Sequence, residues 1–356
     1  MLKAREAVQS LPTYHPPLGG REGLRLDFNE NTVGCSPRVA EKLREISRDT
    51  LARYPERGAV ETQVADFLGR QGEEILLTNG VDEGIHLLCE TYLEPGDEVI
   101  IVVPTFAMYE IYARATGAKV MSIPAGEGFV FPTDKVLGAI SLRTRLIAIA
   151  NPNNPTGTGV SKTDLLRVAE VAPHAALLVD EAYFEFFDQT VIGDVGRVPN
   201  LFVARTFSKA YGLAGLRIGV LAGEREQMKM VRRVSSPYNV NAAALACLPE
   251  AIANSQYVSQ YVRECVMNRR RLEEFFAAEG IPFWPSHANF VLARFDELRE
   301  PFTRGMRERG ILVRDRNSDY GCAGCVRITA GMDSQMDGLF AAMKDVLREC
   351  RERQVR

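Results

Sequence analysis

The chain has 356 residues, which exceeds the size at which one hydrophobic core usually stops growing, so two domains are expected. Its 46% hydrophobic and 25% charged residues are typical of a soluble globular protein, and its formal net charge of -3 gives no general attraction to nucleic acid or to anionic membranes. The first ten residues have no apolar core, and no apolar run approaches the roughly 20 residues of a membrane span. We therefore predict a cytoplasmic protein with no nucleic-acid partner and no membrane partner.

The cysteines give no sign of a metal site. Of the seven, Cys322 and Cys325 have the spacing of half a zinc site or of a redox pair. No second pair of this kind exists, and none of the four histidines clusters nearby. Because cytosolic thiols are usually reduced and unpaired, we predict no metal.

The first 240 residues predict repeated βα units. Segments 98–103, 145–150 and 176–179 are nearly continuous apolar runs rich in Val, Ile and Leu, which suit parallel strands covered on both faces. Segments between them, such as 162–171, have helical periodicity. The pattern predicts an α/β fold with a mostly parallel central sheet sandwiched by helices.

The pattern changes after about residue 235. Residues 242–279 predict one long helix, followed by short strands at 289–293, 311–313 and 326–329 and an amphipathic helix from about residue 332. Most of the arginines on the long helix are expected to form a solvated face: Arg263, Arg269, Arg270 and Arg271. We predict an N-terminal arm over residues 1–40 that is part of the small domain, a large α/β domain over 41–240 and a small α+β domain over 241–356.

Two early motifs suit a ligand site. Residues 74–85 predict a strand, a tight turn at Gly80 and a helix start, so that the amides of Val81 and Asp82 would face a phosphate. Asp82 also suits a first helical turn through the helix dipole alone. After the strand 98–103, Phe106 is placed to stack on a flat heterocycle, although a core phenylalanine is the ordinary explanation.

Two later strands end in polar groups. The strand 145–150 runs into segment 151–157, whose prolines and glycine fix a rigid turn that presents the Asn154 amide as a donor. The strand 176–179 ends at Asp180, at the sheet edge where ligands of open α/β sheets bind. An aspartate there can hold a pyridine nitrogen protonated, and the alternative is a cap for the next helix.

The strongest local signal is segment 204–219, in which Lys209 follows Thr206 and Ser208 and precedes Arg217. A lysine that is partly buried near positive charge becomes nucleophilic, which permits Schiff-base chemistry. Thr206, Ser208 and Arg217 would supply donors for a phosphate, with Arg217 as the charged one. The alternative is an exposed lysine beside a glycine-rich turn.

Taken in this order, the segments resemble fold-type I enzymes that depend on pyridoxal phosphate (PLP), specifically the aminotransferases similar to histidinol-phosphate aminotransferase. The resemblance runs from residues 26–31 to residues 326–331 and implies the PLP-dependent transferase fold type I. It implies a Schiff base on Lys209, the pyridine nitrogen at Asp180, and the cofactor O3′ at Tyr183 and Asn154. It also implies a phosphate site and a ring stack made by Gly80, Val81, Asp82, Thr206, Ser208, Arg217 and Phe106.

The same resemblance implies an obligate homodimer with shared active sites, because Tyr54 matches a tyrosine that reaches the phosphate bound in the other subunit. Arg327 matches the arginine that grips the substrate carboxylate, and Arg314 matches a second one used for the phosphate of histidinol phosphate. Tyr14 and Asn29 lie where an N-terminal arm closes over the substrate, and Tyr54 is expected to border it too.

These matches imply ping-pong transamination in which histidinol phosphate is the amino donor and 2-oxoglutarate is the acceptor. The catalytic residues would be Lys209, Asp180 and Tyr183. Departures from the family border the substrate pocket: residues 32–35 lack the usual prolines, Phe106 replaces the commoner tyrosine, and the loop after Arg314 contains the charged residues Asp315, Arg316 and Asp319. An aromatic amino-acid aminotransferase and a threonine-phosphate decarboxylase on the same scaffold therefore stay open. A non-catalytic regulator with an aminotransferase-like domain is disfavoured by the net charge of -3.

Overall fold

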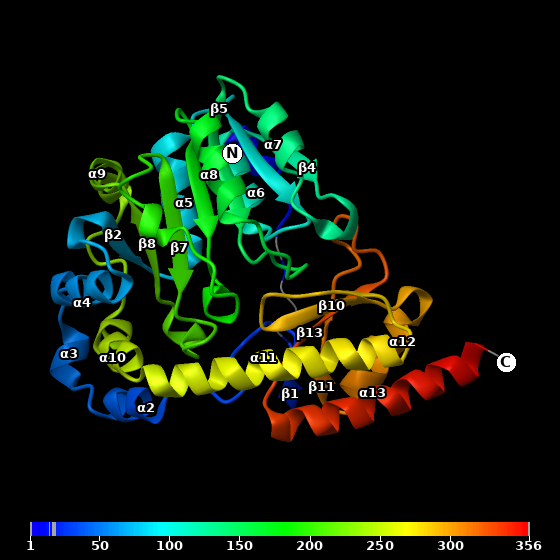
Figure 1. Ribbon diagram of the computed structural model, residues 1–356. Coiled ribbons are helices and arrows are strands. Elements are labelled where there is room, and N and C mark those ends of the chain that lie inside the picture. The colour runs from blue at the N-terminus through cyan, green and yellow to red at the C-terminus, as the bar shows by residue number, and fades with distance from the viewer. Residues whose placement is uncertain (1, 14, 16–18, 355–356) are drawn as a thin grey trace.

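A computed structural model describes residues 2–13, 15 and 19–354, and a seven-stranded sheet forms its centre (Figure 1). The strand order is β2 (Ile75–Thr78), β8 (Gly219–Gly223), β7 (Leu201–Thr206), β6 (Ala176–Asp180), β5 (Thr144–Ala150), β3 (Glu98–Val103) and β4 (Lys119–Pro124). All neighbours are parallel except β8, which runs antiparallel to both β2 and β7. The predicted α/β class with a mostly parallel sheet is confirmed.

Both faces of this sheet are covered by helices, which explains the continuous apolar strands. Alternate residues of β6 pack into different apolar clusters: Leu177 and Val179 into one, Ala176 and Leu178 into the other. The first cluster includes residues of α4 (Gly58–Leu68), α8 (Lys162–Val171) and α10 (Ala242–Ala253). The second includes residues of α5 (Val81–Tyr92), α6 (Met108–Thr116) and α9 (Arg225–Val234). Strands buried on both sides need no polar residues at every second position.

A smaller antiparallel sheet has the order β12 (Arg314–Asp315), β13 (Cys325–Thr329), β10 (Phe290–Arg294) and β9 (Phe283–Trp284). It packs with α11 (Ser255–Ala278), α12 (Arg299–Glu308) and α13 (Asp333–Gln354) around a separate apolar cluster. An N-terminal strand, β1 (Leu24–Arg25), joins this region by pairing in parallel with β11 (Ile311–Leu312). The exact domain limits stay a prediction.

The expected helix over 242–279 is two helices, because α10 ends at Ala253 and α11 begins at Ser255. The expectation of a solvated arginine face was wrong for Arg269, which is buried and donates a hydrogen bond to the Ala288 carbonyl at 3.0 Å. It lies one turn from Cys265 and Leu272, which face the protein interior.

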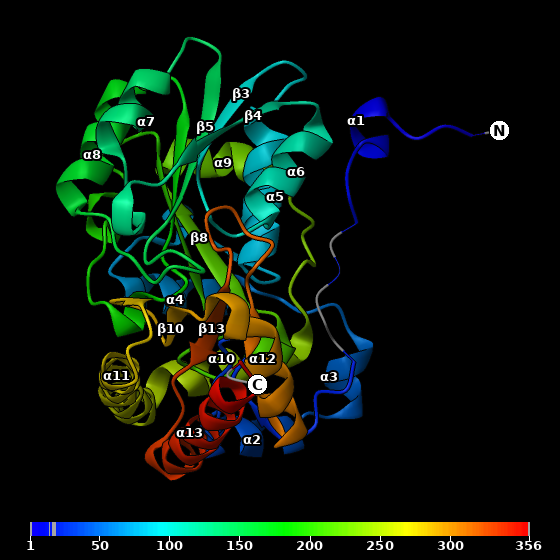
Figure 2. The ribbon, with the colours of Figure 1, turned by 90° about the vertical axis from the view of Figure 1, so that its right-hand side faces the viewer.

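The remaining helices lie at the periphery: α1 (Glu6–Gln9), α2 (Pro37–Arg44), α3 (Arg48–Ala52) and α7 (Thr133–Ala139). α1 lies beside α6 (Figure 2). No helix in the described part of the chain is long and apolar enough to cross a membrane.

Candidate active site

One edge of the seven-stranded sheet borders a cavity of about 1050 Å³. Parallel strands place their carboxyl ends at one edge, so the residues that follow β3, β5, β6 and β7 meet there. Since β8 is antiparallel, Arg217, two residues before its start, reaches the same edge. The β12–β13 hairpin of the smaller sheet forms the opposite wall, and residues 10–13 and 15 line part of the cavity.

Asp180 is buried at the end of β6, with 5% of its surface exposed. Its carboxylate accepts a hydrogen bond from the Tyr109 hydroxyl at 2.6 Å and another from the Ala182 backbone N–H at 3.0 Å. Burial raises the pKa of Asp180 to about 6, although both hydrogen bonds favour the charged form. A buried carboxylate with so few partners is suited to hold a cationic group of a ligand.

This raised pKa predicts a stability effect in the ligand-free protein. A carboxyl that holds its proton more tightly when folded lowers the free energy of unfolding as pH rises between about 4 and 6. Asp180→Asn removes this cost, so we expect the variant to be more stable than wild type by on the order of 2 kcal/mol at pH 8, and by little at pH 4.

Denaturant unfolding of the ligand-free protein at the two pH values measures this difference. Asp134→Asn, which changes a carboxylate that is 92% exposed, is the matched control and should be neutral at both. A variant of Asp180 that is less stable than wild type at pH 8 would contradict the account.

Lys209 follows β7 and is half-buried, with its Nζ facing the cavity. Nζ donates a hydrogen bond to the Phe28 carbonyl at 3.0 Å and lies 5.9 Å from the centre of the Tyr183 ring. The Tyr183 hydroxyl accepts a hydrogen bond from the Asn29 amide at 2.9 Å. The lysine is therefore held by one carbonyl and by no carboxylate among the described residues, which leaves it available to a ligand.

An anion cradle lies across the cavity from the hairpin, around the N-terminus of α5. Gly80 has a φ of +77°, a backbone conformation that favours glycine, and a Cβ there would lie 2.6 Å from Nη2 of Arg217, so a side chain would displace the guanidinium. Nη2 of Arg217 donates to Asp82 at 2.8 Å. Thr206 and Ser208 also line the cavity. Backbone amides at a helix start, hydroxyls and a guanidinium are the kinds of donor that suit a phosphate.

Arg327 on β13 connects the two sheets at the cavity. It is 4% exposed, and its guanidinium donates to the Asn154 side-chain oxygen and to the Asp27 carbonyl, the latter at 2.7 Å. Burial, followed by the positive charge of Arg316, lowers the pKa of Arg327 to about 9. A cation placed so deeply in a cavity is suited to bind a carboxylate or phosphate of a ligand.

All but three of the predicted site residues line one cavity. The exceptions are Gly80, which adjoins Val81 and Arg217 without lining the cavity itself, Tyr54 and Tyr14. Those that line the cavity are Asn29, Val81, Asp82, Phe106, Asn154, Asp180, Tyr183, Thr206, Ser208, Lys209, Arg217, Arg314 and Arg327. Tyr54 lies outside it, 76% exposed, and stacks on Tyr238 with ring centres 4.4 Å apart. Tyr14 lies outside the described residues.

Sequence reasoning missed Tyr109. Its ring is buried, meets the Phe106 ring edge-on with centres 5.7 Å apart, and bonds Asp180. The signal was its position three residues after Phe106, which places Phe106 just before α6 and Tyr109 in the first turn of that helix, close enough for the two rings to meet.

Glu181, next to Asp180, contributes to the framework. It is buried and pairs with Arg205 of β7 at 2.9 Å, while Thr190 and the Val191 N–H donate to it. In the described part of the chain, no three His, Cys, Asp or Glu residues are grouped so that they would hold a metal ion. Cys322 and Cys325 are both buried and free.

The chain is similar to known proteins along almost its whole length. The chain is 33% identical over 328 residues to the histidinol-phosphate aminotransferase of Caldanaerobacter subterraneus subsp. tengcongensis, an alignment that covers 91% of this chain and 93% of the relative. It is 36% identical over 334 residues to that of Roseiflexus castenholzii, with 91% and 89% covered. The crystal structure of histidinol-phosphate aminotransferase from Sinorhizobium meliloti in complex with pyridoxal-5'-phosphate superposes with a TM-score of 0.89 at 25% identity, covering 98% of both chains. Residues 21–342 match the family aminotransferase class I and II. The chain belongs to the class I and II aminotransferase family.

Proposed function

We propose that this protein is a PLP-dependent aminotransferase that moves the amino group of histidinol phosphate to 2-oxoglutarate. The observation that carries the proposal is one cavity in which Lys209, the buried Asp180 and the buried Arg327 converge. The proposed substrate is supported by the relatives named above, which are histidinol-phosphate aminotransferases.

The cavity fits PLP in its polar groups. Asp180 is a buried carboxylate that suits the protonated pyridine nitrogen, and the Gly80–Arg217 cradle suits the phosphate. Phe106 lines the space between them and would stack on the ring, and Tyr183 and Asn154 would reach its phenolate oxygen. PLP, when bound, supplies an electron sink for the substrate's Cα–H bond.

Each residue at the cavity would have its own role in the reaction. The Lys209 Nζ would bind the cofactor, be displaced by the donor's amine, and take the proton from the donor's Cα as a general base. Asp180 would keep the cofactor's ring nitrogen protonated, with Tyr109 fixing the carboxylate. Asn29 orients the Tyr183 hydroxyl toward the same space.

The substrate would be held from the hairpin wall. Arg327 suits a planar carboxylate, because two N–H groups of a guanidinium match two oxygens. Arg314 lies opposite Arg327 in the β12–β13 pairing and lines the same cavity. Two guanidinium groups on one wall suit both proposed substrates in turn: a phosphate in one half-reaction and a dicarboxylate in the other.

A homodimer with shared sites is part of the proposal. Tyr54 and Tyr238 form an exposed aromatic pair, with 76% and 54% of their surfaces accessible in the single chain. Aromatic residues such as tyrosine are enriched at protein interfaces. Tyr54 would then reach the phosphate site of the other subunit.

Initial rates with alternative donors test the substrate. With 2-oxoglutarate as acceptor, we expect kcat/KM for histidinol phosphate to exceed that for phenylalanine by about 100-fold or more, because a buried cationic wall is left unpaired by a donor without phosphate. A preference for phenylalanine would instead indicate an aromatic aminotransferase. Release of carbon dioxide from threonine phosphate would indicate a decarboxylase.

A further inference from the structure

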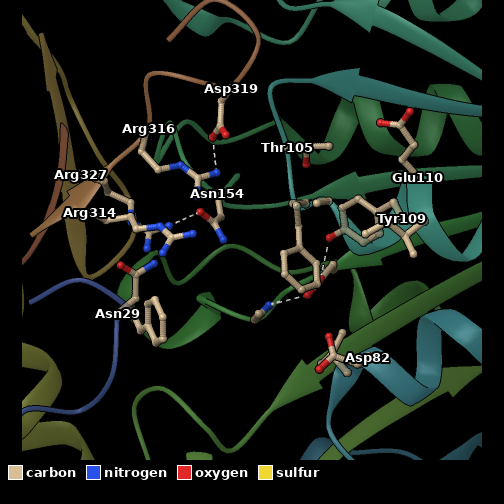
Figure 3. A pocket seen from close by; sticks show the side chains of 18 of the residues that line it. Asn29, Asp82, Thr105, Tyr109, Glu110, Asn154, Arg314, Arg316, Asp319 and Arg327 are labelled. Atoms are coloured by element: carbon tan, nitrogen blue, oxygen red, sulfur yellow. Dashed lines mark hydrogen bonds and ion pairs between the residues drawn. The ribbon is translucent and has the colours of Figure 1, made fainter. Parts of the chain in front are cut away.

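The β12–β13 hairpin presents three arginines to the cavity. Arg314 pairs with Arg327 across the two strands, and the N–H of Arg316 extends the ladder by donating to the Cys325 carbonyl at 3.0 Å. Because side chains alternate along a strand and opposite residues share a face, Arg314, Arg316 and Arg327 share one face. All three line the cavity and lie together on one side of it, across from Asp82 (Figure 3).

The loop that follows places the carboxylate of Asp319 beside Arg316. The Asp319 N–H donates to the Arg316 carbonyl at 3.0 Å, which closes a turn and brings the two side chains into an ion pair (Figure 3). Asp315 accepts from the Asn317 N–H at 2.8 Å, and Asn317 accepts from the Gly324 N–H at 2.9 Å. These three hydrogen bonds hold the turn, and the turn holds the Arg316–Asp319 pair in place.

The pair is only partly satisfied. The side chains of Arg316 and Asp319 are 13% and 23% exposed, and burial raises the pKa of Asp319 although Arg316 and Arg327 favour its charged form. Among the described residues, the buried Nε of Arg316 has no hydrogen-bond partner. This wall therefore has three guanidinium groups, of which Arg316 is paired with Asp319, and the Nε atoms of Arg316 and Arg327 keep N–H donors without a partner among the described residues.

We propose that Arg316 is a further ligand for the phosphate of the amino donor, and that Asp319 is its counter-ion whenever no phosphate is bound. The inference rests on the proposed function and extends it to a residue outside the Arg314–Arg327 pair. A phosphate monoester carries nearly two negative charges and three acceptor oxygens, so it can engage more than one guanidinium.

The same pair would select phosphate over carboxylate. A carboxylate on Arg327 gains nothing by displacing Asp319, because one monoanion replaces another. A phosphate dianion gains charge and an extra acceptor for Arg316. Asp319 therefore keeps the third guanidinium from strengthening the binding of ordinary amino acids, which have only a carboxylate at this position.

Arg316→Gln tests the first part. Loss of one charge-assisted hydrogen bond should raise KM for histidinol phosphate about tenfold or more, with kcat and KM for 2-oxoglutarate changed less than about threefold. Arg316→Lys should recover part of the loss. Arg309→Gln makes the same change in an ion pair with Glu349 outside the cavity and should leave all constants unchanged. An unchanged KM for histidinol phosphate in Arg316→Gln would overturn the proposal.

Asp319→Asn distinguishes two roles for Asp319: a counter-ion that the phosphate displaces, or one half of an ion pair that holds the loop. If Asp319 is only a counter-ion that the phosphate displaces, Asp319→Asn should leave KM for histidinol phosphate unchanged or lower it. If the pair instead holds the loop, Asp319→Asn and Arg316→Gln should raise KM alike. That second result would overturn the assignment.

Failure of the wild-type enzyme to turn over histidinol phosphate would refute the proposed function. The phosphate site at Arg316 would then be tested separately, by inhibition. Phenyl phosphate and benzoate would then be compared as inhibitors of the PLP-loaded enzyme with any amino acid that it does turn over. Stronger inhibition by phenyl phosphate that is lost in Arg316→Gln supports the phosphate site. Equal inhibition of wild type and variant by phenyl phosphate overturns it.

Discussion

Replacing Lys209 with alanine should lower kcat by roughly a thousandfold or more, because a single group would supply both the bond to the cofactor and the general base. The side chain makes one hydrogen bond, to the Phe28 carbonyl, so its removal should cost little folding stability. Initial rates with histidinol phosphate and 2-oxoglutarate measure the loss, and thermal unfolding shows that the fold is kept.

Lys229→Ala is the matched control, since Lys229 lies on the exposed side of α9 and pairs only with Glu226 among the described residues. It should keep wild-type rates. Added primary amines give a second check, because an external base can replace part of a missing lysine. Near-normal turnover by Lys209→Ala would refute the catalytic assignment.

Asp180→Asn should lower kcat by about two orders of magnitude or more, because removing one partner of a buried ion pair costs about 3 kcal/mol or more. The amide keeps the shape and can still accept from Tyr109, so the loss should be one of charge. Steady-state rates at saturating PLP measure the change.

Tyr109→Phe is the informative comparison for this residue. It removes the hydrogen bond to Asp180 but leaves the charge, so we expect a much smaller loss of kcat than in Asp180→Asn. Equal losses in the two variants would mean that position, and not charge, is what Asp180 provides. Asp180→Asn with wild-type kcat would remove the residue from the proposed mechanism.

The large sheet and most of the cavity could be predicted because their signals are local. Strands β3, β5 and β6 are continuous apolar runs, and the rule that ligands bind at the carboxyl ends of parallel strands places Asn154 and Asp180 at one edge. Lys209 and Arg217 follow from the composition of one segment. Recognition of the family then added Arg314 and Arg327, whose positions in the smaller sheet no local pattern links to the cavity.

Contacts that depend on tertiary packing were not predictable in this way. Tyr109 and Asp180 are far apart in sequence, and their hydrogen bond depends on how α6 rotates against the sheet. The charge of Arg269 favours a solvent-exposed position. Its helical spacing from Cys265 and Leu272, however, places it on the buried face of α11. The Arg316–Asp319 pair depends on a turn in which backbone N–H groups donate to the side chains of Asp315 and Asn317, which the charge pattern alone does not reveal.

Covalent mapping of the cofactor tests the central claim most directly. The protein would be loaded with PLP, reduced with borohydride and digested, and the modified peptide identified by mass spectrometry. We predict a single pyridoxyl group on Lys209, absent from Lys209→Ala and from wild type that is first treated with histidinol phosphate. A pyridoxyl group on another lysine, or none, would contradict the account.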